Sequence, residues 1–577
     1  MILTLLVATA AQAPSHHRAA VRPYQPRNVI VVVLDDVGTE QIAAYGCPTA
    51  WGESQARMPA LDQLRAHGVM FRRAWATPVC SPTRAMFLTG RHGFRTGMLG
   101  LAETPGPCAP GMTQTGYLTC CPTGDPGCTL PESPVALPLH PTGYSLPDSE
   151  ITIAEMLRDS VFPGGQTYTR GAFGKWHLSA APGDPCHPIR QGFDVFAGHL
   201  FNNEGAAGHY AWQQHAARAT PSGCAVYSST PSGQWDAERT GLDARAWIEG
   251  VISSENPRRS FFAMVSFNPP HWPFQVPPQA LVSPTTWDEL VLAGLDTEGL
   301  RVEGVRSCLP GTNQEIDSRA ARLVYRASLE AVDTLIGRLV FRSAAEPFLL
   351  ENTVVIVVGD NGTPDQVAWS TQDPSAISPN SAPFPPNHAK RHVYELGVRV
   401  PLIVTGAGVA QGATCDSLVS AVDLPATILD LVGASTGLAP QVGDGQSFAS
   451  RFIHPNAPFS PGDRDHVYTE VASRNGMTYS SATRQWSPVV PGGPVEYQRA
   501  ILDASGFKYI RRVVGLDPGC SLAGSPCDIA PEEEMYRLFD ANGDLDIYES
   551  RPLCGDVEAE FQRTNLRSMM DTLYTGG

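Results

Sequence analysis

The chain has 577 residues, 42% of them hydrophobic, and its 41 Lys and Arg against 57 Asp and Glu give a formal net charge of −16. This composition excludes a disordered or fibrous protein, and the length suffices for several domains or for one large α/β domain with a smaller appendage. The acidic total disfavours binding of nucleic acid or anionic membrane through the overall field, so we expect neither as a partner.

The first thirteen residues resemble a secretory signal. Residues 2–9 form a short apolar run, and Ala-Gln-Ala at 11–13 resembles a small-residue cleavage site. No basic segment precedes the run, so a hydrophobic N-terminus is the alternative. No later stretch approaches the roughly 20 apolar residues that span a bilayer. We therefore expect export to a periplasm, the extracellular space or a secretory lumen, with 1–13 as signal peptide and no membrane span.

The thirteen cysteines are an odd number, so oxidation of the thiols would leave at least one without an intrachain partner. Four of them lie in the Pro/Gly/Thr-rich segment 102–149, which would gain stability from disulfides. They are Cys108, Cys120, Cys121 and Cys128. A zinc site is the weaker alternative there, because only His140 is near and no paired CxxC spacing occurs.

From residue 28 onward, short β-branched or aromatic runs alternate with helical patterns. This alternation predicts an α/β fold with a large, mostly parallel (mixed) sheet sandwiched by helices. The predicted strands are 28–34, 167–173, 261–267, 353–358 and 400–404.

Helices are predicted between these strands. Thr152 and Glu155 form a capping box at one helix start, and Asp423 is predicted to cap another with Pro425 in its first turn. Apolar spacing predicts a helix over 320–340. After about residue 450 the segments become shorter and richer in turns, which predicts a smaller C-terminal subdomain.

Polar residues follow four of the predicted strands. They are Asp35 and Asp36, Lys175 and His177, His271, and Asp360 and Asn361. The carboxyl ends of parallel strands line one edge of a sheet, where ligands bind. Carboxylate and amide oxygens suit Ca²⁺ or Mg²⁺. Either the Asp-Asp or the Asp-Asn pair alone could form a turn or a helix cap. Asp35 and Asp36 would repel each other at a dry strand end unless a cation compensated them, so the whole set, with the basic residues at the same edge, predicts a metal site.

A second acidic group resembles the start of a calcium loop. It comprises Asp540, Asn542 and Asp544. The sixth position holds Leu545 instead of glycine, so we interpret this group as a solvated turn.

Basic residues form a second constellation, made of Arg84, Lys175, His177, His271 and Lys390. Each residue alone could be an exposed lysine or a capping histidine, so the interpretation depends on the set. A divalent cation with several cationic donors around it suits a tetrahedral oxyanion whose charge needs neutralising as a bond breaks. Phosphate and sulfate esters both fit this arrangement.

Residues 78–90 read PVCSPTRAMFLTG. This segment resembles the signature of the type I sulfatases, of the alkaline-phosphatase-like superfamily, in which the cysteine of C-x-P-x-R is oxidised to formylglycine. Cys80, Pro82 and Arg84 occupy the defining positions, and the match continues through Thr89 and Gly90. Proline disfavours the helical conformation of the residue before it, which suits a segment that a maturation enzyme must bind in extended form. The resemblance implies a formylglycine-generating enzyme as a partner during maturation.

The resemblance extends from about residue 27 to about 440. It implies a calcium ion held by Asp35, Asp36, Asp360, Asn361 and the formylglycine at position 80. GKWH at 174–177, PPHWPF at 269–274 and KRHVYELGVRVP at 390–401 match further family segments, and MYRLFD at 535–540 resembles a C-terminal strand. Leu396 stands where glycine is usual, and Thr167 and Arg170 replace the usual glycine and threonine.

The pattern and the resemblance together imply two parts after the possible signal peptide 1–13. Residues 27–445 would form the catalytic α/β domain with 102–149 as an insertion, and 450–577 a smaller α+β subdomain with a short antiparallel sheet.

The resemblance also implies a role for each catalytic residue. The hydrated aldehyde at position 80 would attack sulfur with one hydroxyl and later expel sulfate through the other. Asp360 would act as base, and His177 would take the second proton. His271 and Lys390 would bind substrate and protonate or stabilise the leaving alcohol, while Lys175 and Arg84 would bind sulfate oxygens and the hydrated aldehyde. Removing Cys80 from the thiol pool leaves 13 − 1 = 12 cysteines, which could pair completely.

Three functions are consistent with this pattern. The leading hypothesis is a calcium-dependent sulfuric ester hydrolase. The alternatives are a phosphate or phosphonate ester hydrolase of the same superfamily and a sulfatase-like binding protein with unconverted Cys80. The loops 102–149, 201–235, 268–310 and 362–388 are predicted to select the substrate, and their aromatic content allows aryl, carbohydrate or steroid sulfates alike.

Overall fold

The computed structural model of this chain describes most of its length. The described residues are 28–47, 54–102, 112–114, 120–122, 145–162, 165–179, 183–203, 208–229, 233–254, 259–302, 313–343, 346–347, 352–364, 366–368, 389–434, 443–473, 477–480, 485–488, 496–514, 533–538, 553 and 557–575. Predictions for the signal peptide, for Cys108 and Cys128, for the turn at 540–545 and for most of 362–388 lie outside them.

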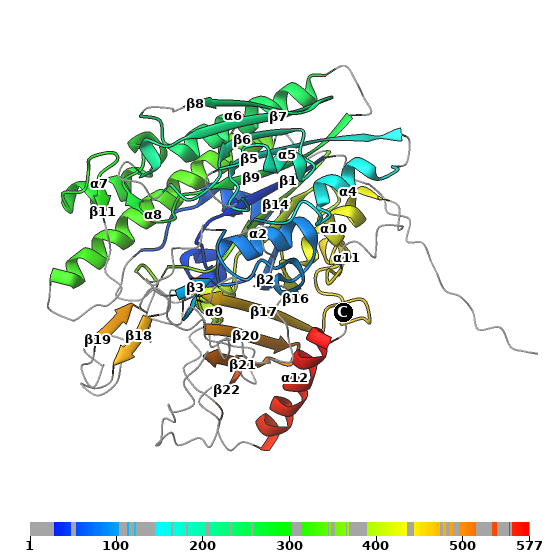
Figure 1. Cartoon of the computed structure of the whole chain (residues 1–577). Helices are drawn as coiled ribbons and strands as arrows, with labels where there is room; N and C mark the ends of the chain where they lie inside the picture. The colour runs from blue at the N-terminus through cyan, green and yellow to red at the C-terminus, as the bar shows by residue number, and fades with distance from the viewer. Residues whose placement is uncertain are drawn as a thin grey trace, which may run out of the picture.

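A ten-stranded mixed sheet forms the centre of the molecule, in the order β16-β2-β15-β14-β1-β9-β5-β6-β7-β8 (Figure 1). The strands are β1 (Asn28–Leu34), β2 (Gly68–Trp75), β5 (Thr167–Lys175), β6 (Val195–His199), β7 (Gln214–Thr220), β8 (Gly223–Ser229), β9 (Arg259–Phe267), β14 (Thr353–Gly359), β15 (Leu402–Gly406) and β16 (Ala413–Ser420). The neighbours β14, β1, β9, β5 and β6 run parallel, so their carboxyl ends share one edge.

Helices cover both faces of this sheet because successive residues of each strand face opposite ways. In β1, Val31 packs in one hydrophobic cluster with residues of α2, α4 and α10, and Val32 packs in another with residues of α1, α6 and α8. The main helices are α1 (Pro59–Ala66), α2 (Cys80–Thr89), α4 (Ile153–Asp159), α6 (Asp236–Ile252), α7 (Pro284–Leu292), α8 (Asn313–Val340) and α10 (Asp423–Val432). Short helical turns include α3 (Gly93–Thr96), α5 (His187–Arg190), α9 (Glu395–Val398), α11 (Ser450–Ile453) and η4 (Gly208–Tyr210).

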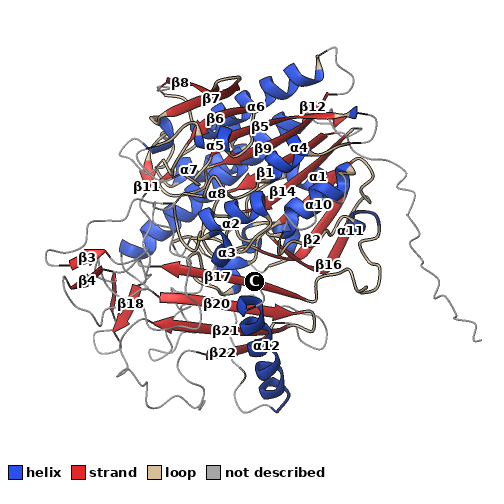
Figure 2. Cartoon of the chain, turned by 45° about the vertical axis from the view of Figure 1, so that its right-hand side comes forward, coloured by secondary structure: helices blue, strands red, loops and turns tan. Residues whose placement is uncertain are grey.

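A smaller antiparallel sheet lies beside the main one, with helix α12 (Val557–Thr575) packed across it (Figure 2). Its order is β17-β20-β21-β22, and its strands are β17 (His466–Ser473), β20 (Glu496–Asp503), β21 (Phe507–Val514) and β22 (Glu533–Arg537). The predicted fold class is therefore confirmed. The boundary between 27–445 and 450–577 stays a prediction.

Short two-stranded ladders complete the described strands. They pair β3 (Met112–Gln114) with β4 (Cys120–Pro122), β10 (Phe274–Gln275) with β11 (Arg301–Val302), β12 (Phe341–Ser343) with β13 (Glu346–Pro347), and β18 (Met477–Ser480) with β19 (Gln485–Pro488).

All five predicted strands are present, although the one predicted at 400–404 lies at Leu402–Gly406 and runs antiparallel to β14. Thr152 and Glu155 form the predicted capping box. The prediction for Asp423 is wrong, because it is the first residue of α10 and its carboxylate binds Arg464 and loop amides instead of capping the helix. The loop predicted at 201–235 instead contains the hairpin β7–β8, which extends the sheet.

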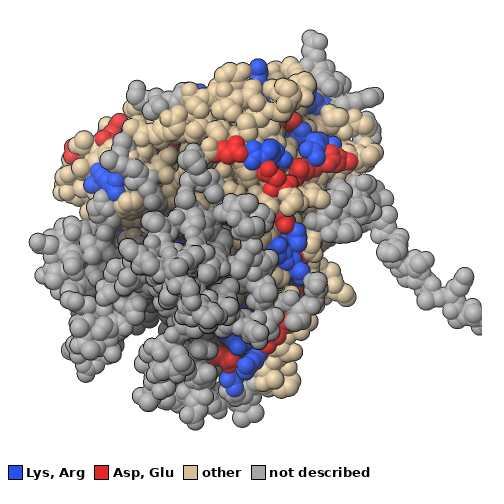
Figure 3. All heavy atoms as spheres, viewed as in Figure 1, with Lys and Arg blue, Asp and Glu red and all other residues tan. Residues whose placement is uncertain are grey.

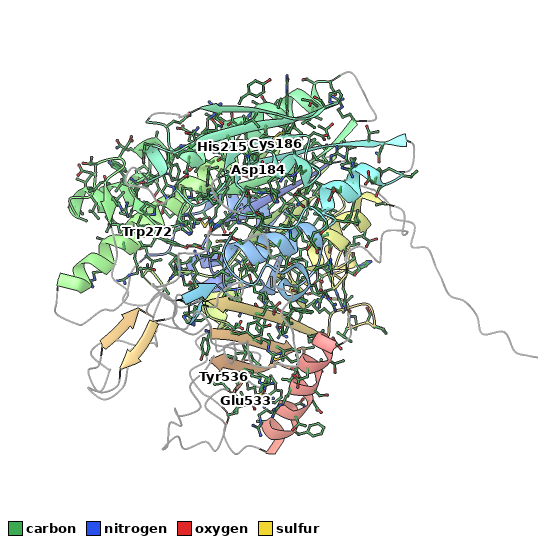
Figure 4. All side chains as sticks on the ribbon, in the orientation of Figure 1. Asp184, Cys186, His215, Trp272, Glu533 and Tyr536 are labelled. Atoms are coloured by element: carbon green, nitrogen blue, oxygen red, sulfur yellow. A yellow bond between two sulfur atoms is a disulfide. The ribbon has the colours of Figure 1, made fainter. Side chains whose placement is uncertain are left out.

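The described cysteines leave the prediction for position 80 untested, but they show that the remaining cysteines do not pair completely. Cys80 is unpaired, as its proposed role requires. Cys186 and Cys224 form a disulfide, which joins α5 to the hairpin β7–β8 at the end of the molecule far from Glu533 and Tyr536 (Figure 4). Complete pairing is wrong, because Cys47 and Cys415 are free, and Cys415 is buried in the hydrophobic core.

The surface and the helices give two further findings. On the face shown in Figure 3, Lys and Arg side chains lie beside Asp and Glu side chains, so charges of both signs are mixed over the part that is described. Within the described residues, every helix is too short or too polar to cross a membrane.

Candidate active site

The four parallel strands β14, β1, β9 and β5 are consecutive neighbours, so the residues after them converge as predicted. We call the converging charged and polar side chains the strand-end cluster. It comprises Asp35, Asp36, Cys80, Arg84, Lys175, His177, His271, Asp360, Asn361 and Lys390, and each of these residues is at most 8% exposed. Every predicted site residue is therefore part of one buried group.

Cys80 and Arg84 reach this edge on helix α2, whose first residue is Cys80. The entry to the helix is fixed by Thr83, whose hydroxyl accepts from the Thr77 amide at 2.9 Å. Arg84, one turn after Cys80, donates from Nε and Nη2 to Oδ2 of Asp360 at 2.9 and 2.7 Å, and from Nη1 to the Lys175 carbonyl at 2.7 Å. The C-x-P-x-R spacing thus puts the sulfur and the guanidinium on the same side of one helical turn.

The remaining cations pair with the acids that follow β1. Lys175 forms an ion pair with Oδ2 of Asp35. Lys390 forms one with Oδ1 of Asp36 at 2.5 Å, and Nε2 of His271 lies 3.7 Å from Oδ2 of Asp36. Alternating acids and bases thus allow these charges to be buried together.

Two oxygens of the strand-end cluster are buried without a hydrogen-bond partner, Oδ1 of Asp35 and Oδ1 of Asn361. Burial and the nearby Asp360 raise the pKa of Asp35 to about 7, so its charge is poorly compensated despite Lys175. Ligand atoms of Asp35, Cys80 and Asp360 all lie within 4.8 Å of one another. Unsatisfied hard oxygens in a compact acidic group fit a divalent cation such as Ca²⁺ or Mg²⁺.

The cysteine of this site is not an activated thiol. Its Sγ lies 3.2 Å from Nδ1 of His177. Burial raises the pKa of the Cys80 thiol to about 11, and burial with the charges of Lys175 and Arg84 holds the pKa of His177 well below its usual range. At neutral pH the pair is a neutral thiol and a neutral imidazole, so Cys80 itself is a weak nucleophile.

Backbone strain marks the same region. Among the described non-glycine residues, positive φ occurs at Asp36 (64°), His177 (56°) and Arg391 (80°). Two of these belong to the strand-end cluster and the third follows Lys390. Residues held in this sparsely populated region gather at functional sites, where the surrounding structure fixes them.

Sequence reasoning missed residues that support the site from outside the motifs. Tyr325, in α8, donates to the carbonyl of Asp36 at 2.6 Å. His209 and Asp236 form a buried pair whose histidine ring reaches the carbonyl of His271 at 3.0 Å. Neither lies in a motif of its own, and the only sequence signal for Tyr325 is that it is an aromatic residue within the helix predicted over 320–340.

A family model described as Sulfatase matches residues 27–434 of the chain. Human arylsulfatase A is 25% identical over 425 residues, which is 71% of this chain and 65% of that protein. Human arylsulfatase D is 33% identical over 179 residues, which is 30% of this chain and 23% of that protein. The chain therefore covers less than two thirds of the length of these relatives.

Two solved structures share the fold at low identity. The structure of Ps i-CgsB has a TM-score of 0.58 and 18% identity, and covers 96% of this chain and 93% of its own. PsFucS1 sulfatase from Pseudoalteromonas sp. has a TM-score of 0.56 and 17% identity, with 96% and 91% covered.

Proposed function

This chain belongs to the sulfatase family, and we propose that it hydrolyses sulfate esters through a formylglycine made from Cys80 and a calcium ion at the strand-end cluster. The observation that carries the proposal is the burial of Cys80 against three carboxylates and three permanent cations at one edge of the sheet. A binding protein would need only some of these groups.

Asp35, Asp36, Asp360 and Asn361 would hold the cation together with an oxygen at position 80. Two of these residues carry the unpartnered oxygens, which supports this assignment. When present, the cation and the hydrated aldehyde supply an ionised hydroxyl nucleophile and charge neutralisation for the sulfate group.

The side chains around position 80 would bind and orient the ester. Lys175 and Arg84 present positive charge from two elements, β5 and α2, and would bind sulfate oxygens. Asp360 would accept the proton of the attacking hydroxyl, and His177, whose Nδ1 already faces position 80, is neutral and would accept the second.

His271 and Lys390 would serve the leaving alcohol. Nδ1 of His271 donates to the Trp272 carbonyl at 2.6 Å, which leaves Nε2 to face the cluster. Burial lowers the pKa of His271, as do Lys390 and Lys175. The negative charge of a bound sulfate ester opposes this effect, so Nε2 can carry a proton to the leaving oxygen. Asp36 raises the pKa of Lys390, so its ammonium persists beside the same oxygen.

The test combines a mass measurement with kinetics on the protein from its native host. We expect the tryptic peptide with position 80 to carry the mass of formylglycine and the protein to hydrolyse an aryl sulfate much faster than the matched aryl phosphate. Unmodified cysteine in that peptide would favour the binding protein. Faster cleavage of the phosphate would favour the phosphate ester hydrolase.

We also propose that the protein is exported. The Cys186–Cys224 disulfide supports this, because disulfides persist in oxidising compartments. Fractionation of the native host, followed by thiol counting on the isolated protein, tests it. Recovery in a reducing compartment with both thiols free would contradict it.

A further inference from the structure

A second buried polar group adjoins the strand-end cluster behind His271. It contains His209 of η4, Asp236 at the start of α6, and Asn268 after β9, which are 1%, 0% and 1% exposed. None of these residues takes part in the roles proposed above. Burial of a carboxylate and an imidazole costs free energy unless their hydrogen bonds are satisfied, so the contacts of this group matter.

Both ring nitrogens of His209 face groups that accept hydrogen bonds. Nδ1 lies 2.9 Å from Oδ2 of Asp236, and Nε2 lies 3.0 Å from the carbonyl of His271. Both nitrogens therefore donate, and the ring is an imidazolium. Burial opposes this charge, but Asp236 outweighs burial and raises the pKa of His209.

The amide of Asn268 is compatible with this assignment. Its nitrogen lies 3.3 Å from Nδ1 of His209, while its Oδ1 is buried without a partner. A half-turn of the amide lets Oδ1 accept from Nδ1, so that one donor is shared with Asp236.

The turn that carries His209 is tied to the His271 segment at further points. The His209 amide donates to Oε1 of Gln275 at 2.7 Å, and the Tyr210 hydroxyl donates to the carbonyl of Val276 at 3.0 Å. Gly208 permits this approach, because its φ is +53° and a Cβ there would lie 2.2 Å from Oε1 of Gln275. Residues 271–276 are thus held from one side by two consecutive residues, His209 and Tyr210.

We propose that His209, anchored by Asp236, is a positioning residue that fixes the backbone of His271 and thereby aims Nε2 at the leaving oxygen. This inference rests on the proposed function. The carbonyl that His209 binds belongs to His271 itself, so a shift there moves the imidazole directly. A misplaced donor matters most when the departing alcohol is a poor leaving group, because an acidic phenol departs without protonation.

Two variants at position 209 test this on a series of aryl sulfates whose phenols differ in pKa. His209→Leu removes both hydrogen bonds at similar volume, whereas His209→Gln keeps an amide donor for the carbonyl. For His209→Leu we expect kcat to fall about 100-fold on the least acidic phenol and only about 3-fold on 4-nitrophenyl sulfate, the range of a general acid. KM should change little, and His209→Gln should fall between His209→Leu and the wild type.

His92→Leu is the matched control. His92 is also buried, but its ring stacks on Phe94 and packs against Tyr468, away from the His271 segment. It should reduce stability without changing the dependence of kcat on phenol pKa.

Amide hydrogen exchange gives a readout without turnover. Peptides covering 268–276 should exchange faster in His209→Leu and unchanged in His92→Leu. If His209→Leu fails to fold, Asp236→Asn replaces it, because this variant leaves the ring of His209 in place. It should change the dependence of kcat on phenol pKa and the exchange at 268–276 in the same directions.

Equal loss of kcat across the series, or unchanged exchange at 268–276, overturns the inference and leaves the proposed function intact. A wild-type protein that carries formylglycine and releases sulfate from no ester overturns both.

Discussion

Two buried charge groups in this molecule use the same residue types differently. In the Asp423–Arg464 pair, Oδ1 of Asp423 accepts from Arg464 and from the Gln446 amide, and Oδ2 accepts from Arg464 and from the Ser420 amide. Both oxygens are satisfied, and the pair joins α10 to the loop before β17. In the strand-end cluster, Asp35 leaves one oxygen without a partner although Lys175 and Arg84 are near.

This difference in hydrogen bonding distinguishes a buried ion pair that stabilises the fold from a buried group that is arranged to bind a ligand. A fully bonded buried pair can stabilise the fold, since hydrogen bonds within the protein replace those that each polar atom made to water. A group with surplus acceptors and a carboxyl pKa raised to about 7 does not optimise stability by itself. Such incompleteness is expected where a ligand supplies the missing partner.

The largest effect should come from Asp35→Asn. Loss of a cation ligand should lower kcat/KM about 1000-fold or more, because a bound cation is worth several kcal/mol in the transition state. Without calcium, the variant should lose less stability than one that breaks a fully bonded buried pair, because the charge of Asp35 is poorly compensated even though Lys175 stays buried. Kinetics and urea unfolding in chelator would measure both. Near-normal kcat/KM would refute the metal role of Asp35.

Asp423→Asn should have the opposite profile. Removal of one partner from a buried ion pair typically costs about 3–5 kcal/mol in the free energy of unfolding, because Arg464 stays buried with its charge. The kcat of the folded fraction should stay within about twofold of the wild type, since uninvolved sites usually add independently. Urea unfolding and active-site titration would measure these two quantities. A stable Asp423→Asn variant with low kcat would contradict the assignment of this pair to stability alone.

Glu470 in β17 provides a third, pH-sensitive case. It accepts from the Phe94 amide at 2.8 Å and from the Tyr468 and Tyr497 hydroxyls, and burial raises its pKa to about 7 from 4.5. The folded protein therefore binds a proton that the unfolded chain releases between pH 4.5 and about 7, so stability falls as pH rises through this window.

Glu470→Gln should remove up to about 3 kcal/mol of this pH dependence. Parallel unfolding curves at several pH values, with Asp423→Asn as the comparison, would measure it. Identical slopes for the wild type and Glu470→Gln would contradict the assignment.

Calcium should stabilise the folded protein by binding at the strand-end cluster. At a free concentration about 100 times Kd, it should add about 2.7 kcal/mol to the free energy of unfolding. Thermal unfolding should show a rise in Tm for the wild type and for Asp423→Asn, and none for Asp35→Asn. An equal rise in all three would place the ion elsewhere.

The sequence predicted the convergence at the strand-end cluster because each site residue follows a recognisable strand or lies in a short motif. The rule that parallel strands end at one edge was enough to predict the positions of Asp35, Lys175 and Asp360. Asp423 was misassigned because its partner, Arg464, lies 41 residues away. The pair of His209 and Asp236 was missed for the same reason, since only the packing of η4 against α6 brings it together.

The hairpin β7–β8 was mistaken for a loop. Its sequence has few β-branched residues, and the antiparallel pairing with β6 overrides the weak local preference.

The burial of helix α2 has a consequence for the conversion of Cys80 to formylglycine that we propose. All ten residues from Cys80 to Thr89 are buried, and Cys80 itself is 0% exposed. A second protein could bind the main chain around Cys80 only before α2 packs into the hydrophobic core. Under this proposal, oxidation of Cys80 competes in time with folding, and a chain that folds first keeps an unmodified cysteine that is 0% exposed.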